Sequence, residues 1–163
     1  MPLDQPPTIS QRELLRRQNL VRKLASELGF HGQVEYRHIY SQSGGAQFGL
    51  GPRIGSDVLI VYAEAFLRDA TPDDFSLNAI LAHECGHQLV FRHPKLSRWL
   101  RGKISLLSEE ALASLVGSLL VSNVDDHNAL TMKAICDAMD RGAEQSRAEE
   151  VILKMRSVLE AIL

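Results

Sequence analysis

Cysteine, tryptophan and long apolar runs are scarce in this sequence. It has 2 cysteines and 1 tryptophan among 163 residues, and 6% of its residues are aromatic. Two cysteines, Cys85 and Cys136, cannot build a disulfide framework, which fits a reducing compartment. No apolar stretch approaches the roughly 20 residues of a membrane-spanning helix, and the first residues lack the basic and apolar regions of a signal peptide. We therefore expect a cytoplasmic protein with no membrane association.

An excess of charge of either sign is also missing. The chain carries 18 lysine and arginine residues against 20 aspartate and glutamate residues, which gives a net charge of −2. Such a balance supplies no overall field for holding a polyanion, so we expect no nucleic-acid partner. The sequence leaves the oligomeric state undetermined.

The composition is otherwise that of an ordinary globular domain. Apolar residues make up 45% of the chain and charged residues 23%, close to the averages for globular proteins. A length of 163 residues corresponds to one domain. We expect a single domain over 1–163, in which the proline-rich residues 1–9 form a disordered tail.

The first half of the chain predicts a helix followed by a small mixed or antiparallel sheet. A capping box at Ser10–Glu13 opens a helix that runs to Gly29. Alternating and apolar stretches then predict strands, one of them bounded by glycines and placed at the sheet edge because Pro52 cannot occupy a central strand. The expected strands cover 34–40, 46–50 (the edge strand) and 57–62.

After residue 63 the pattern is helical. Thr71–Asp74 combines an N-cap, a proline at the first helical position and acidic first-turn residues, which predicts a helix that continues until His93-Pro94 ends it. A second capping box, Ser146–Glu149, is expected to open the last helix. Helices are predicted over 108–122, 126–141 and 147–162, which makes the whole chain an α+β domain.

The helix that ends at His93 contains an HExxH pattern, His83-Glu84-Cys85-Gly86-His87. Residues four apart return to nearly the same helix face, so both imidazoles can reach one zinc ion, and Glu84 can reach a metal-bound water. Gly86 costs about 1 kcal/mol relative to alanine in a helix, which indicates close packing against another backbone. Cys85 points away from the ligand face and should be buried. The alternative is a helix with two ordinary, partly buried histidines.

A catalytic zinc site needs a third protein ligand, and the candidates are His93, Glu109 and Glu110. His93 has the spacing of the metzincin pattern from His87, but Val90 stands where that pattern has a helix-breaking glycine. On a continuing helix His93 would lie about 9 Å farther along the axis, out of reach of the same ion.

The two glutamates differ in the residues that share their helix face. Small residues accompany Glu110, so its helix could pack closely against the HExxH helix and deliver a carboxylate to the metal. Large apolar residues accompany Glu109, which is typical of core packing. We predict Glu110 as the ligand, the alternative being that both are first-turn acids favoured by the helix dipole. The small residues are Ala113, Ser114 and Gly117, and the large ones Leu112, Val116 and Leu120.

Two motifs give the sequence a resemblance to the gluzincin zinc metallopeptidases, most closely to the compact minigluzincins related to HtpX-like and ImmA/IrrE-type proteases. Asn78–His87 is similar to the family's apolar-AHExGH signature, and Glu110–Ser114 is similar to its ExxA[D/N] glutamate helix. The resemblance extends loosely over 10–122. It departs from the family at Ser114, where an aspartate or asparagine orients neighbouring groups.

The resemblance implies a zincin-like fold with one zinc ion per chain, bound by His83, His87 and Glu110, and with Glu84 as general base. In such proteases an edge strand above the cleft pairs with an extended substrate, and Ala46–Leu50 is the candidate strand. An oxyanion stabiliser is also expected. The candidate for that role is His127, followed by Tyr40 and His38.

These observations predict a zinc-dependent metalloendopeptidase that hydrolyses a protein or peptide bound in extended form. The alternative is a zincin-fold regulatory or partner-binding module whose metal is structural or vestigial, which the serine at position 114 keeps open. A third function is metal-dependent hydrolysis of a small amide, for which a deep closed pocket would be the sign.

Overall fold

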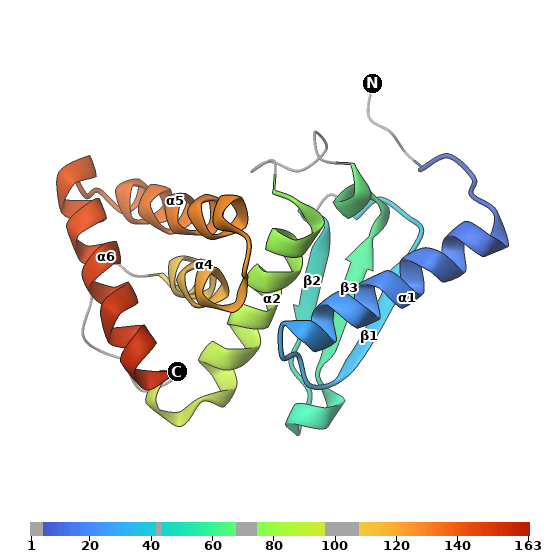
Figure 1. Ribbon diagram of the computed structural model, residues 1–163, viewed down its shortest axis with the longest axis horizontal. Coiled ribbons are helices and arrows are strands. Elements are labelled where there is room, and N and C mark those ends of the chain that lie inside the picture. The colour runs from blue at the N-terminus through green and yellow to red at the C-terminus, as the bar shows by residue number, and fades with distance from the viewer. Residues whose placement is uncertain (1–4, 42–43, 68–74, 97–107) are drawn as a thin grey trace.

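A computed structural model describes residues 5–41, 44–67, 75–96 and 108–163. It is an α+β fold in which a small sheet lies at one end of the molecule and helices at the other (Figure 1). None of the helices in these ranges is long and apolar enough to cross a membrane. The helices are α1 (Gln11–Glu27), α2 (Leu77–Arg92), α4 (Glu109–Leu120), α5 (Val124–Asp140) and α6 (Gln145–Ile162), and the strands are β1 (Gln33–Arg37), β2 (Ala46–Gly49) and β3 (Val58–Tyr62).

The sheet is mixed, with strand order β1-β3-β2. The central strand β3 pairs parallel with β1 and antiparallel with β2, so β2 lies at an edge as predicted. β1 is shorter than the expected 34–40, since it ends at Arg37. The reason is a tight turn in which the Ile39 N–H donates to the Arg37 carbonyl at 2.9 Å, which turns the chain out of the sheet.

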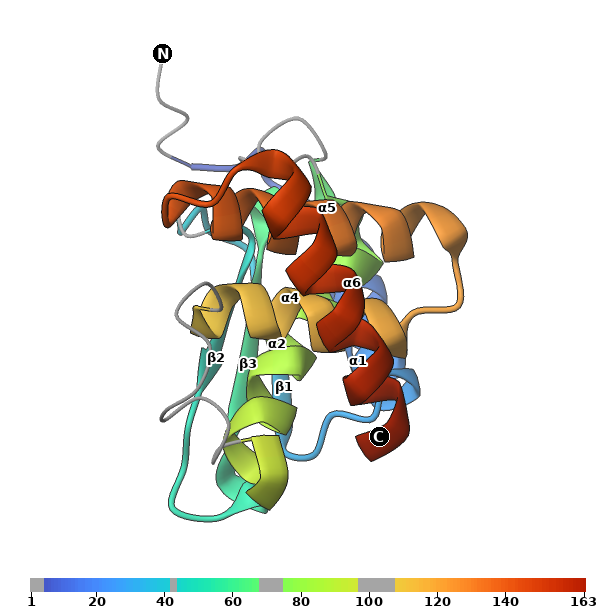
Figure 2. The ribbon, with the colours of Figure 1, turned by 90° about the vertical axis from the view of Figure 1, so that its left-hand side faces the viewer.

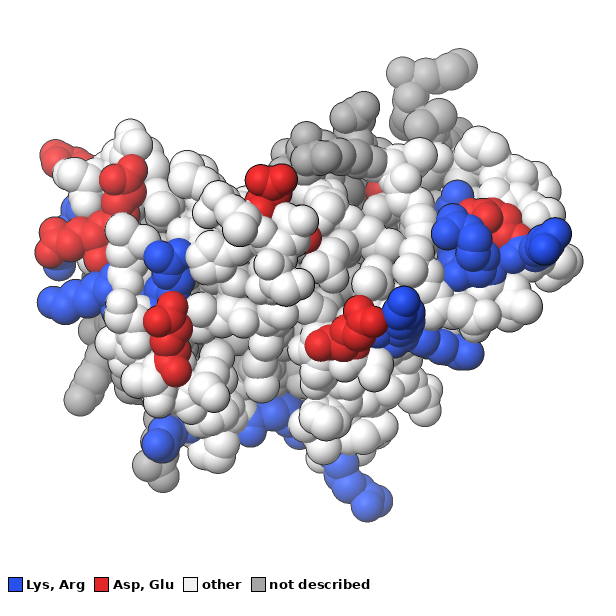
Figure 3. All heavy atoms as spheres, in the orientation of Figure 1, with Lys and Arg blue, Asp and Glu red and all other residues white. Residues whose placement is uncertain are grey.

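Helix α1 begins and ends where the local signals indicate. The Ser10 hydroxyl accepts a hydrogen bond from the Glu13 N–H at 3.1 Å, and Gly29 follows the helix with a φ of 85°. The Glu13 carboxylate forms ion pairs with Arg16 at 2.7 Å and Arg17 at 3.0 Å. The charges of both signs that gather at the α1 end in Figure 3 are therefore partly compensated by ion pairs.

The outer edge of β1 is closed by a side chain of α1. The Gln18 amide donates to the Val34 carbonyl at 3.2 Å and accepts from the Tyr36 N–H at 2.9 Å. These are the two backbone groups that a neighbouring strand would otherwise pair with. Gln18 therefore occupies the β1 edge and leaves β2 as the other edge of the sheet.

Helix α2 starts later than predicted. Phe75 and Ser76 are not helical, so a continuous helix from Thr71 to His93 is wrong, while Thr71–Asp74 themselves lie outside the described residues. Ser76 is the N-cap because its hydroxyl accepts from the Ala79 N–H at 3.1 Å. The same hydroxyl donates to Asp126 of α5 at 2.5 Å, so a tertiary contact supports this start. The helix ends before His93, as predicted.

The three C-terminal helices are present, with shifted starts. Ser108 caps α4 by accepting from the Ala111 N–H at 3.1 Å. Helix α5 begins at Val124 rather than 126, since the Asn123 side chain accepts from two backbone N–H groups. The capping box predicted at Ser146 is wrong, because α6 already begins at Gln145.

Helix α2 lies between two apolar cores and belongs to both (Figure 1). The first core joins α1, the sheet and one side of α2, and it includes Cys85, which is buried as predicted. The second core joins the end of α2 to α4, α5 and α6, with α6 outermost (Figure 2). The HExxH helix therefore packs against apolar residues on two sides, and this packing fixes the direction in which its polar face points.

Candidate metal centre

His83, Glu84 and His87 form one cluster on α2. One ligand atom from each of them lies within 4.8 Å of the other two. The two imidazole rings are 4.8 Å apart between centroids and almost perpendicular, at 88°. The prediction that both histidines share a helix face is therefore confirmed, and the cluster is compatible with a metal site.

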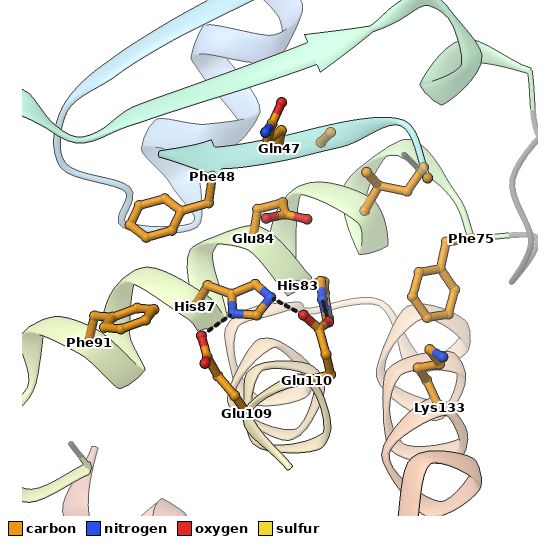
Figure 4. Close-up of a pocket in the computed structure, with 13 residues that line it drawn as sticks. Gln47, Phe48, Phe75, His83, Glu84, His87, Phe91, Glu109, Glu110 and Lys133 are labelled. Atoms are coloured by element: carbon orange, nitrogen blue, oxygen red, sulfur yellow. Dashed lines mark hydrogen bonds and ion pairs between the residues drawn. The ribbon is translucent and has the colours of Figure 1, made fainter. Parts of the chain in front are cut away.

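Glu110 of α4 faces both histidines (Figure 4). Its Oε2 lies 2.9 Å from His83 Nε2, and its Oε1 lies 3.2 Å from His87 Nε2. Glu109 reaches the other nitrogen of the same ring, with its Oε1 3.4 Å from His87 Nδ1. The Nε2 atoms of both histidines therefore converge on a single carboxylate, that of Glu110.

Two glycines bring the helices of this cluster together. A Cβ at Gly86 of α2 would collide with the Ala113 carbonyl of α4, and a Cβ at Gly117 of α4 would collide with the Ala82 carbonyl of α2. The predicted close packing of small residues is therefore confirmed. It holds the glutamate-bearing turn of α4 against the histidine-bearing turn of α2.

Ser114 supports the first histidine from behind. Its Oγ lies 2.8 Å from His83 Nδ1, and Ser114 is fully buried. With His83 Nε2 turned toward Glu110, this hydrogen bond fixes the ring orientation. The serine that departs from the family motif thus contacts a histidine of the cluster.

Burial and charge act in opposite directions on the carboxylates of this cluster. Burial raises the pKa of Glu84 above its ordinary value, although both histidines and the Phe48 N–H oppose the shift. Hydrogen bonds from His83 and His87 lower the pKa of Glu110. Glu84 is consequently the more basic of the two carboxylates.

The cluster lines a pocket of about 630 Å³ between β2 and the helices. The backbone of Phe48 in β2 lies close enough to the Glu84 carboxylate to favour its charged form, so the edge strand lies beside the cluster (Figure 4). The Phe48 and Phe91 rings stack, with centroids 6.4 Å apart. Outside the histidines and glutamates, the lining residues are Gly44, Ala46, Gln47, Phe48, Phe75, Ile80, Phe91 and Lys133.

His127, the candidate oxyanion stabiliser, is not among the residues that line this pocket. Its Nδ1 donates to the Ser118 carbonyl at 2.7 Å, and Arg156 donates to its Nε2 at 2.8 Å. Both ring nitrogens thus join α4, α5 and α6, and the ring serves packing between helices. His127 therefore does not enter the function proposed below.

The other candidates also lie outside the pocket lining. His38 donates from Nε2 to the Pro7 carbonyl at 2.6 Å, which holds part of the N-terminal segment, and its Nδ1 lies 2.8 Å from the Tyr36 hydroxyl. Tyr40 is half-buried outside the pocket. His93 accepts at Nδ1 from the Lys95 N–H at 3.3 Å, beyond the end of α2.

Phe75, Phe91 and Lys133 line the pocket without having been predicted. Lys133 comes from α5, and nothing in its local sequence distinguishes it from a surface lysine. Phe91 lies one helical turn after His87, which is the one sequence signal that could have placed it on the same face.

Comparisons with known proteins gave no further assignment: no family model matches the sequence, and no curated protein or solved structure matches it.

Proposed function

We propose that this chain is a zinc-dependent metallopeptidase of the gluzincin type. The observation that carries the proposal is the convergence of His83 Nε2 and His87 Nε2 on the Glu110 carboxylate, with Glu84 beside them. Two imidazoles and one carboxylate are a donor set that catalytic zinc uses, with the fourth position left for water or substrate. His83, His87 and Glu110 would therefore hold the ion.

Glu84 is proposed as the general base. A zinc ion in such a site lowers the pKa of water toward 7 and polarises a carbonyl group. Glu84 then accepts a proton from a water in the pocket and passes it to the leaving amine. The position of its carboxylate, within 4.8 Å of ligand atoms of both histidines, supports this role.

The edge strand β2 is proposed to bind the substrate as an added strand. The Tyr62 N–H donates to the Gly45 carbonyl at 2.9 Å, so Gly45 and, by alternation, Gln47 face β3. Ala46 and Phe48 consequently direct their backbone groups to the outer edge, toward the pocket. Because Gln18 closes the β1 edge, β2 is the edge that supports peptide addition.

The proposal is tested by metal content and cleavage together. Purified protein should hold one zinc ion per chain after dialysis, and Glu110→Ala should lose it. The wild type should cleave an unfolded protein or a peptide library. Glu84→Gln should keep zinc but lose activity by about 100-fold or more. Glu160→Gln, an exposed glutamate on α6, is the matched control and should behave like wild type.

Two results would reject the peptidase. One is a wild type that binds no zinc at micromolar metal. The other is equal cleavage by Glu84→Gln and the wild type. A zinc-loaded protein whose biological activity survives Glu84→Gln would favour the partner-binding module instead.

A further inference from the structure

The two ends of the pocket differ in charge. Glu109 and the exposed ring of Phe91 lie at one end, beside His87, and Phe75 and Lys133 lie at the other (Figure 4). Of the described residues that line the pocket, Lys133 is the one lysine or arginine. An extended ligand along β2 would therefore meet a carboxylate at one end and an ammonium group, itself paired with Asp137, at the other.

Lys133 is held at the pocket wall by its own helix. Its Nζ lies 3.0 Å from Asp137 Oδ1, one turn farther along α5, and 28% of its side chain is exposed. The remaining Asp137 oxygen, Oδ2, is buried and has no hydrogen-bond partner among the described residues. Asp137 therefore pairs with Lys133 and helps to orient its ammonium group.

The surroundings of Lys133 strengthen a charge contact. Phe75 and Ile80 are buried apolar residues of the same pocket. Apolar walls exclude water, so an ion pair formed there is screened less than one on an open surface. Glu109 at the opposite end would repel an anionic group and so favours its placement at the Lys133 end.

We infer that Lys133 selects substrates with a carboxylate at the Phe75 end of the pocket. The inference rests on the proposed function, since it names the peptides that the same site would take. The carboxylate can belong to an aspartate or glutamate side chain or to a free peptide C-terminus, and both offer the same two oxygens to the ammonium group.

The position of this carboxylate in the peptide also shows whether the bound peptide runs parallel or antiparallel to β2. β2 runs from Ala46, near the Phe75 end, to Phe48, which stacks on Phe91 at the other end. A peptide antiparallel to β2 would place residues C-terminal to the scissile bond near Lys133, and a parallel peptide would place N-terminal residues there. A free C-terminus can satisfy Lys133 only in the antiparallel direction.

The test measures peptide binding to the zinc-loaded Glu84→Gln protein. Peptide pairs differ by glutamate or glutamine at one position, scanned along the sequence, with the C-terminus amidated. A second arm compares free and amidated C-termini. At one scanned position the glutamate peptide should bind about tenfold more tightly than the glutamine peptide, or the free C-terminus should bind about tenfold more tightly than the amidated one. Lys133→Met should bring this ratio close to one, and Lys133→Glu should favour lysine peptides instead.

Lys133→Arg should keep the preference, and Lys154→Met, an exposed lysine of α6, is the control that should not change it. Lys133→Gln replaces Lys133→Met where the latter does not fold. An unchanged ratio in the Lys133 variants overturns the inference. Cleavage by the wild type with no carboxylate preference also overturns it but leaves the peptidase standing. If the preference for carboxylate peptides depends on Lys133 but the wild type cleaves no peptide, the peptidase is rejected and the inference about Lys133 stands. No binding of any peptide rejects both.

Discussion

Gly86 of α2 lies so close to Ala113 of α4 that no side-chain atom fits between them. The contact is backbone to backbone, and Gly117 makes the equivalent contact with Ala82 one turn away. Because Glu110 stands one turn before Ala113 on α4, this spacing also sets the distance from its carboxylate to the histidines.

Gly86→Ala is expected to destabilise the protein. The new methyl group would overlap the Ala113 carbonyl, and overpacking of this kind costs about 1–3 kcal/mol, more than the roughly 1 kcal/mol gained in helix propensity. Denaturant unfolding measures the loss. Gly55→Ala is the control, since a Cβ there meets no atom within 4 Å. Equal stability of the two variants would contradict the packing described here.

Ser114→Ala should weaken metal binding. Removal of its hydroxyl leaves His83 Nδ1 without the partner that orients the ring, and loss of such a contact typically lowers metal affinity by about tenfold or more. Competition with a chelator measures the affinity for zinc. Ser118→Ala is the matched control, because that buried hydroxyl donates to the Leu115 carbonyl instead. Equal affinities in both variants would show that Ser114 does not support the metal.

Asp57→Asn should destabilise the protein and change its acid sensitivity. Burial raises the pKa of Asp57, but hydrogen bonds from Arg92, Gln88 and the Gly51 N–H outweigh burial and lower it. A depressed folded-state pKa stabilises the fold above pH ~4, and this contribution is lost as the pH falls further. Breaking the pair should cost about 3 kcal/mol at neutral pH.

Unfolding curves at pH 7 and at pH 3 measure both effects of Asp57→Asn. The difference between wild type and variant should shrink at the lower pH. Asp140→Asn, an exposed aspartate at the end of α5, is the control. A difference that stays constant with pH would mean that the Asp57 charge does not stabilise the fold.

Gln18→Ala should open the β1 edge. The Tyr36 N–H would lose its partner and the Val34 carbonyl would be left with the longer bond from Arg22 Nε at 3.4 Å, at a cost of about 1–2 kcal/mol, and an open edge favours pairing between chains. Unfolding measurements and size-exclusion chromatography at several concentrations test both effects. Gln11→Ala, at the exposed start of the same helix, should leave stability and elution unchanged.

The two cysteines should differ in reactivity toward iodoacetamide. Burial raises the pKa of the Cys85 thiol to about 12, so its thiolate is scarce and inaccessible, whereas Cys136 is exposed. Mass spectrometry should find one modified cysteine in the native protein and two after unfolding. Rapid native modification of Cys85 would contradict its buried position.

Local signals identified much of this fold and of the candidate metal centre. The helical spacing of His83 and His87 places them on one face whatever surrounds the helix, and Gly86 already indicated a close helix neighbour. Capping predicted the start of α1, and the small residues beside Glu110 predicted the carboxylate on which both Nε2 atoms converge, although Glu109, expected on a face of core packing, also reaches His87. These features depend on residues within a few positions of one another.

Other features depend on partners far along the chain. The Ser76 cap is supported by Asp126, 50 residues away, which a local reading of Thr71–Asp74 could not anticipate. His127 had the right chemistry for an oxyanion stabiliser, but the Ser118 carbonyl and Arg156 use both of its ring nitrogens.

The sequence by itself thus determined the helix that carries the metal-ligand pattern, the face on which both histidines lie and the small residues that admit a second helix. The tertiary structure decided that Ser114 contacts His83, that Gln18 covers the outer edge of β1, and that Lys133 reaches the pocket. The physical reason is that helix periodicity and capping act over one or two turns. Which side chains meet across the pocket follows only from how α2, α4, α5 and the sheet pack together.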